Sequence, residues 1–82
     1  MTRQELVEKA RTLLAHRLKI DRKMIRPETS IYDLGADSLD VLVIARDFEE
    51  VFSIVIYTRE IQQIRTFDDI ISQLSQKIGC EG

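Results

Sequence analysis

One hydroxyl group of this sequence lies where it could do chemistry, yet it has no base beside it. Ser38 occupies the stretch GADSLD, residues 35–40, between Asp37 and Leu39 and directly before an apolar run. A catalytic serine needs a base within reach and a group that orients that base. The only histidine, His16, falls on the polar side of a predicted helix, and no G-x-S-x-G motif is present. We therefore predict no catalytic residues and expect that the protein is not an enzyme.

A metal centre is not expected either. The chain has one histidine and one cysteine, Cys80, and their positions match no ligand spacing. A single cysteine also excludes an intramolecular disulfide framework.

Two roles then remain open for Ser38. Serine at a helix start is often only an N-cap. Alternatively, the unsatisfied N–H groups and the positive dipole end of a helix suit a phosphate, so the hydroxyl could carry a phosphodiester. Gly35 and Ala36 would leave room for a modifying enzyme, and acidic residues after the serine could steer a basic partner; these acidic residues are Asp40, Asp47, Glu49 and Glu50.

Around this stretch the chain has the pattern of an all-α protein. Thr2 followed by Glu5 is a capping-box pattern that opens a helix of about four turns. Its apolar residues recur at Leu6, Val7, Ala10, Leu13, Leu14 and Leu18. His16 lies on the opposite face and is expected to be exposed.

Residues 19–37 are expected to form a long loop, because Pro27 and Gly35 favour turns. A loop of this length in so small a domain is often functional. The apolar residues predicted to hold it against the core are Ile20, Met24, Ile25, Ile31 and Leu34.

Residues 38–52 form the second predicted helix. The stripe assigned to the core contains Val41, Ile44, Ala45, Phe48, Val51 and Phe52. The other side carries Leu39, Leu42, Val43, Arg46, Glu49 and Glu50. The first two turns are thus apolar nearly all round, so this helix is either central to a small bundle or presents a docking face beside Ser38.

Residues 53–57, SIVIY, have strand-forming side chains but no second strand-like run to pair with, so we predict an extended connector. Thr58 is predicted to cap a short helical turn that continues through Ile61 and Ile64.

Thr66 is the predicted N-cap of a last helix, with Asp68 and Asp69 favourable in its first turn. Gly79 is its predicted stop, and residues 79–82 are expected to fray. The buried stripe of this helix is assigned to Phe67, Ile70, Ile71, Leu74 and Ile78.

Length and composition favour one cytoplasmic domain over residues 1–82. The net charge is −2, and no apolar stretch approaches the roughly 20 residues of a membrane span. Residues 1–27 contain eight Lys/Arg and three Asp/Glu, but these basic residues are spread out and lack aromatic neighbours. That distribution favours a solvated helix face over a nucleic-acid site. Neither nucleic-acid binding nor membrane insertion is expected.

The stretch DLGADSLD, residues 33–40, resembles the phosphopantetheine attachment motif of acyl carrier proteins. The resemblance covers nearly the whole chain, including the order of the helices and the Thr66-Phe67 helix start. It implies an antiparallel four-helix bundle with a short third helix and a long loop between helices one and two. It also implies 4′-phosphopantetheine, donated by coenzyme A, on Ser38, with Asp37 and Leu39 as flanking recognition positions. Acyl groups would be attached to this arm as thioesters.

The same resemblance implies partners: a phosphopantetheinyl transferase and the enzymes that load and process acyl groups in fatty-acid, polyketide-like or other lipid biosynthesis. A monomer is expected, with no chemical role for Cys80. The implied partner-binding residues are Asp40, Leu42, Val43, Arg46, Asp47, Glu49 and Glu50.

The chain departs from the usual pattern at two positions of this partner face. Val43 stands where an acidic residue is common, and Arg46 where an apolar residue is usual. These differences favour a specialised carrier over the housekeeping one, although drift in surface charge would produce them too. An amino-acyl or peptidyl carrier of the same fold and an unmodified helical interaction domain remain alternatives.

Overall fold

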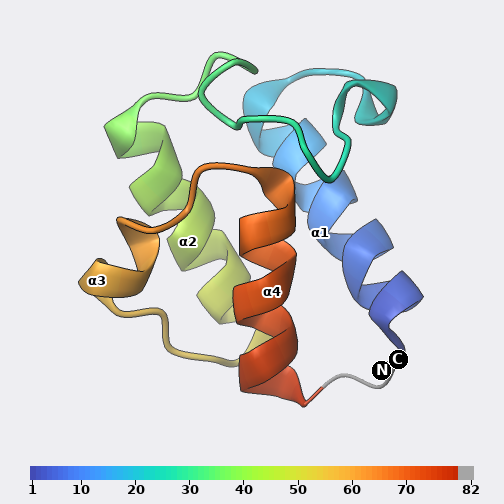
Figure 1. Cartoon of the computed structure of the whole chain (residues 1–82), viewed down its shortest axis with the longest axis vertical. Coiled ribbons are helices and arrows are strands. Elements are labelled where there is room, and N and C mark those ends of the chain that lie inside the picture. Colours follow the sequence, from blue (N-terminus) through green and yellow to red (C-terminus); the bar gives the residue numbers. More distant parts are fainter. Residues whose placement is uncertain (80–82) are drawn as a thin grey trace.

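A computed structural model of the chain describes residues 1–79. Within that range the chain forms four α-helices and one short 3₁₀ helix and no strand (Figure 1). The elements are α1 (Arg3–Leu18), η1 (Arg22–Met24), α2 (Ser38–Phe52), α3 (Thr58–Ile61) and α4 (Phe67–Ile78). The all-α bundle expected from the sequence is confirmed, and the predicted bounds of α2 are those observed.

The helices surround a single core. Figure 1 shows α1 running opposite to both α2 and α4, while α2 and α4 run in the same direction. The antiparallel arrangement therefore describes α1 against its two long neighbours. Short α3 packs beside α2, and the connection from α1 to α2 passes over one end of the bundle. No helix within residues 1–79 has both the length and the apolar character needed to cross a membrane.

Reciprocal hydrogen bonds cap the N-termini of the long helices. The Thr2 hydroxyl accepts the Glu5 N–H at 3.2 Å, while the Glu5 carboxylate accepts the Thr2 N–H at 3.1 Å. Thr66 and Asp69 repeat the arrangement at α4. Each pair satisfies two N–H groups that a helix start would leave without acceptors. The caps predicted at Thr2 and Thr66 are confirmed.

The core is formed by the predicted stripes, with two exceptions. Its largest fully buried side chains are Phe48, Phe67, Leu6, Leu14, Ile31, Ile44, Ile71 and Leu74. Val51 and Met24 were assigned to the interior, and both are wrong, since each is 55% exposed. Val51 lies in the last turn of α2, on the rim of an open hollow beside α1. Met24 ends the 3₁₀ turn, and its neighbour Ile25 takes the buried position instead.

The α1–α2 connection is fixed to the start of α4. The Ile31 N–H donates to the Arg65 carbonyl at 2.9 Å, and the Phe67 N–H donates to the Thr29 carbonyl at 3.0 Å. The Asp68 N–H reaches the Pro27 carbonyl at 2.8 Å. These bonds, with the burial of Ile25 and Ile31, hold the long loop that leads into α2.

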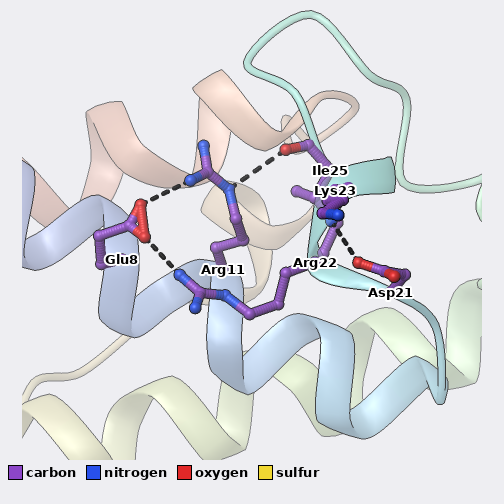
Figure 2. Close-up of polar contacts among 6 residues, drawn as sticks. All are labelled: Glu8, Arg11, Asp21, Arg22, Lys23 and Ile25. Carbon is purple, nitrogen blue, oxygen red and sulfur yellow. Dashed lines mark hydrogen bonds and ion pairs between the residues drawn. The ribbon is translucent and has the colours of Figure 1, made fainter.

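Salt bridges hold η1 against α1. Figure 2 shows the Glu8 carboxylate between two guanidinium groups, with Arg11 2.6 Å away and Arg22 on its other oxygen. Arg11 also donates through Nε to the Ile25 carbonyl at 3.2 Å. Two arginines of the basic first third of the chain, Arg11 and Arg22, are therefore paired with a carboxylate of α1.

The connector after α2 forms no strand, but its first residue, Ser53, is left-handed with φ +55° rather than extended, because it ends α2; Tyr57 at its other end is extended. Ile56 in its middle is buried, and its N–H donates to the Glu49 carboxylate at 3.0 Å. Two details of α3 differ from prediction: its N-cap is Tyr57 rather than Thr58, and it ends at Ile61. The cap moves back by one residue because the Glu60 carboxylate accepts the Tyr57 N–H at 2.9 Å.

The helix α3 ends in a tight turn, whereas α4 ends at a left-handed glycine. The N–H groups of Gln63 and Ile64 bond to carbonyls three residues back, which ends the α-helical pattern before Ile64. Gly79 takes the left-handed conformation with φ +72° and ends α4, as predicted. Apart from Gly79, the residues expected to fray (79–82) lie outside the described part of the chain, and so does Cys80, for which no chemical role was expected.

Candidate functional site

Ser38 is the first residue of α2 and is exposed, but it is not the N-cap of this helix. Asp37 is the cap, and its Oδ1 accepts the Asp40 N–H at 2.9 Å. In return, Asp40 Oδ2 accepts the Asp37 N–H at 3.1 Å. The interpretation of Ser38 as a simple cap is therefore wrong, because the neighbouring carboxylate takes that position and leaves the serine hydroxyl available.

The backbone at the start of α2 retains two donors. Within residues 1–79 the N–H groups of Ser38 and Leu39 have no protein acceptor, whereas that of Asp40 is bound to Asp37. Free N–H groups in the first turn and the positive end of the helix dipole favour an anion at this point. A phosphodiester on the Ser38 hydroxyl would thus be attached at a position suited to its charge.

The turn before α2 presents this hydroxyl. Ile31 is buried, and its carbonyl accepts the N–H groups of Leu34 at 3.2 Å and Ala36 at 3.3 Å. Gly35 between them has φ +100°, a backbone conformation that residues with a Cβ rarely adopt. A buried anchor on each side of the turn therefore fixes where α2 begins, since Ala36 is buried as well.

A hollow of about 310 Å³ opens beside Ser38, between the α1–α2 connection, α2 and α3. It is lined by Tyr32, Ser38, Val41, Leu42, Thr58, Ile61 and Gln62. The apolar side chains from α2 and α3 give it walls suited to an organic chain that starts at the serine. A larger hollow of about 650 Å³ lies between α1 and Val51, away from every residue of the GADSLD stretch.

The residues of the predicted partner face of α2 fall into two groups: some are exposed, and others are bonded within the protein. Leu39, Leu42 and Val43 are exposed by 70%, 47% and 43%, so the apolar first turns form an open surface rather than a doubly buried helix. Arg46 and Glu50 are exposed beside them.

Two other predicted partner residues contact the protein itself. Asp47 Oδ2 accepts a hydrogen bond from Arg17 Nε at 2.8 Å, and Glu49 is bound to the Ile56 N–H. The hydrogen bond from Arg17 to Asp47, and then the negative charge of the Asp47 carboxylate, raise the pKa of the Arg17 guanidinium.

Sequence reasoning missed the capping role of Asp37 and the contributions of Tyr32, Thr58 and Gln62 to the hollow. The first had a recognisable signal, because Asp37 followed three residues later by Asp40 resembles a capping box. The lining residues had none, since the loop and α3 meet α2 only through the tertiary fold.

Comparison with known proteins agrees with this geometry. The family model described as a phosphopantetheine attachment site (PP-binding) matches residues 8–80. An acyl carrier protein of Thermotoga maritima is 32% identical over 79 residues, covering 95% of this chain and 98% of that protein. An acyl carrier protein of Thermosynechococcus vestitus is 32% identical over 81 residues, covering 98% and 100%. The crystal structure of an acyl carrier protein from Thermotoga maritima matches with a TM-score of 0.83 at 29% identity, covering 96% and 93%.

Proposed function

This chain belongs to the acyl carrier protein family, and we propose that it carries acyl groups as thioesters on a 4′-phosphopantetheine arm attached to Ser38. The observation that supports Ser38 most strongly is its place at the start of α2, exposed and relieved of capping by Asp37. When bound, the arm supplies a terminal thiol that holds the acyl group.

The residues around Ser38 fit this arm. The free N–H groups of Ser38 and Leu39 would face the phosphodiester and favour its negative charge. Asp37 and Asp40 keep the helix start ordered through their reciprocal bonds. The hollow beside Ser38 would shelter the part of the arm or acyl chain that lies closest to the protein.

In this role the chain tethers rather than catalyses. A phosphopantetheinyl transferase would modify Ser38 with coenzyme A as donor, and acyl-loading and acyl-processing enzymes would then act on the arm. A tether raises the effective concentration of the acyl group at each enzyme in turn. We propose a single domain that works as a monomer in fatty-acid or a more specialised lipid pathway, where the exposed α2 surface selects the partners.

The carrier role is tested by loading. The protein is first converted to its phosphopantetheine-bearing form with coenzyme A and a broad-specificity phosphopantetheinyl transferase. It is then incubated with radiolabelled acyl donors and an acyl-loading enzyme. We expect the wild type to become labelled and hydroxylamine to release the label, because hydroxylamine cleaves thioesters. The Ser38→Ala variant should carry no label. Ser75→Ala, on α4, is the matched control. Loading of an amino acid in preference to fatty acyl groups would instead support the amino-acyl carrier.

A further inference from the structure

The one-turn helix α3 has two faces with different contacts. At about 100° per residue, Thr58, Ile61 and Gln62 share one face, and all three line the hollow at the start of α2. Glu60 lies on the opposite face and is bonded to α4. Whatever holds Glu60 therefore holds one wall of the hollow from behind.

Two side chains of α4 bind Glu60. Lys77 Nζ lies 2.8 Å from Glu60 Oε1, and Gln73 Nε2 donates to the Glu60 carbonyl at 2.7 Å. Because residues 73 and 77 are four apart, both side chains leave the same face of α4. Lys77 Nζ also lies 5.4 Å from the centroid of the Tyr57 ring, so it contacts the N-cap of α3 as well.

The ion pair contributes more to this hold than the bond from Gln73. The side chains of Lys77 and Glu60 are 18% and 27% exposed, whereas each other ion pair between side chains of residues 1–79 contains one that is 41% exposed or more. Water and salt weaken a shielded pair less. Gln73 Oε1, by contrast, is buried without a hydrogen-bond partner among residues 1–79, and that cost offsets the gain from the Nε2 bond.

The position of α3 depends on such contacts. A helix of four residues has a single turn and is too short to be stable by itself. Ile56 before it and Ile64 after it are buried and anchor the chain in the core. The part that can shift without exposing these anchors is the turn between them, and its bonds to α4 oppose that shift.

We propose that Gln73 and Lys77 are positioning residues that fix α3 as a wall of the hollow beside Ser38, and that they thereby limit the length of the acyl chain that the protein shelters. This inference rests on the proposed carrier function and concerns the specificity of its site. With Glu60 bonded to α4, the hollow has a volume of about 310 Å³. Methylene groups beyond that volume stay in water unless α3 recedes from α2.

Thermal unfolding of acyl-loaded proteins tests the proposal. The wild type and Lys77→Met are loaded from straight-chain acyl-coenzyme A donors of increasing length by a broad-specificity phosphopantetheinyl transferase, and intact mass verifies each product. Each Tm is compared with that of the same protein loaded from coenzyme A itself, so that stability lost through the substitution cancels. Every methylene group that becomes buried should raise Tm by up to about 3–6 °C. We expect this rise to stop at a longer chain in Lys77→Met than in the wild type.

Three further variants complete the design. Lys77→Arg keeps a cation for Glu60 and should keep the length limit of the wild type. Lys9→Met makes the same substitution at an exposed residue of α1 and should keep it too. Gln73→Met leaves the ion pair in place, so it disturbs folding less than Lys77→Met, and it should shift the limit in the same direction by a smaller amount.

The outcomes separate this inference from the carrier function. A common length limit in the wild type, Lys77→Met and Gln73→Met would overturn the proposal. So would a limit that shifts in Lys9→Met, or one that shifts as far in Lys77→Arg as in Lys77→Met. Failure to load any chain on the wild type, while a known carrier is loaded, would instead contradict the carrier function and this inference with it.

Discussion

Asp37 and Asp40 cap one another at the start of α2: each carboxylate accepts the backbone N–H of the other residue, at 2.9 and 3.1 Å. Ser38 lies between them with its hydroxyl in solvent. The pair keeps the first turn of the helix ordered without using the serine. This arrangement leaves the hydroxyl accessible, whereas a serine that capped its own helix would be partly withdrawn.

The capping bond of Asp37 can be separated from its charge. Asp37→Ala removes the acceptor for the Asp40 N–H and should lower the free energy of unfolding by about 1 kcal/mol, the usual loss for an N-cap. Asp37→Asn keeps an oxygen acceptor and should lose much less. Urea denaturation of the two variants beside the wild type measures both values. Equal losses of unfolding free energy in Asp37→Ala and Asp37→Asn would show that the charge, and not the hydrogen bond, stabilises the helix start.

Phe48 and Val51 should respond very differently to truncation, although both were assigned to one apolar stripe. Phe48 is 1% exposed, so Phe48→Ala should cost about 3–5 kcal/mol and leave this small domain largely unfolded. Val51 is 55% exposed, and Val51→Ala should cost less than about 0.5 kcal/mol. Thermal unfolding followed by circular dichroism distinguishes them. Similar shifts in Tm would contradict the observed position of Val51.

Gly35 should resist replacement for a reason of backbone conformation alone. Apart from its own chain neighbours, no atom lies within 4 Å of a Cβ added there, but its φ is +100°. Gly35→Ala should therefore cost about 1–2 kcal/mol, the strain of an L-residue in this region. A chemically synthesised chain with D-alanine at position 35 is the matched control, since it adds the same methyl group and favours positive φ. Equal stability of the L- and D-alanine proteins would refute this explanation.

Asp69 should make the protein less stable in acid. The Thr66 N–H above all, and then the Arg65 N–H, both 3.0 Å from Asp69 Oδ2, lower the pKa of this carboxyl below its ordinary value. Because the pKa is lower in the folded than in the unfolded chain, the stabilisation is complete above the unfolded value of about 3.9 and is lost as the pH falls through the folded value.

Asp69→Asn should accordingly be less stable than the wild type at neutral pH, and the difference should shrink as the pH falls below about 4. Urea midpoints between neutral and strongly acidic pH measure it. The carboxyls of Glu5 and Glu60 also have lowered pKa values, so the variant should keep part of its acid sensitivity. A difference in stability between the wild type and Asp69→Asn that stays constant with pH would contradict this role of the Asp69 carboxyl.

The sequence was sufficient where local chemistry determines structure. The capping boxes at Thr2 and Thr66, the stop at Gly79 and the bounds of α2 follow from bonds between residues three or four apart. Prediction failed where position depends on distant segments. Nothing local says that Val51 faces an open hollow, or that Ile25 rather than Met24 enters the core.

The candidate site divides in the same way. Ser38 and its flanking residues could be found in the sequence, because the motif is contiguous. The occupation of Asp47 by Arg17, thirty residues away, and of Glu49 by Ile56 could not, because both bonds depend on how α1 and the connector pack against α2. These two contacts hold Asp47 and Glu49 against other parts of the fold, while Leu39, Leu42, Val43, Arg46 and Glu50 stay exposed.

The central claim is that Ser38 is the attachment point, and site-resolved mass spectrometry tests it most directly. The wild type and Ser38→Ala are incubated with coenzyme A and a broad-specificity phosphopantetheinyl transferase, beside a known carrier as positive control. Intact masses are followed by fragmentation of the peptide that contains residues 33–40. We predict a single phosphopantetheine on the wild type, located at Ser38, and an unmodified variant. A wild type that stays unmodified while the control is converted, or a group found on another residue, would contradict the account.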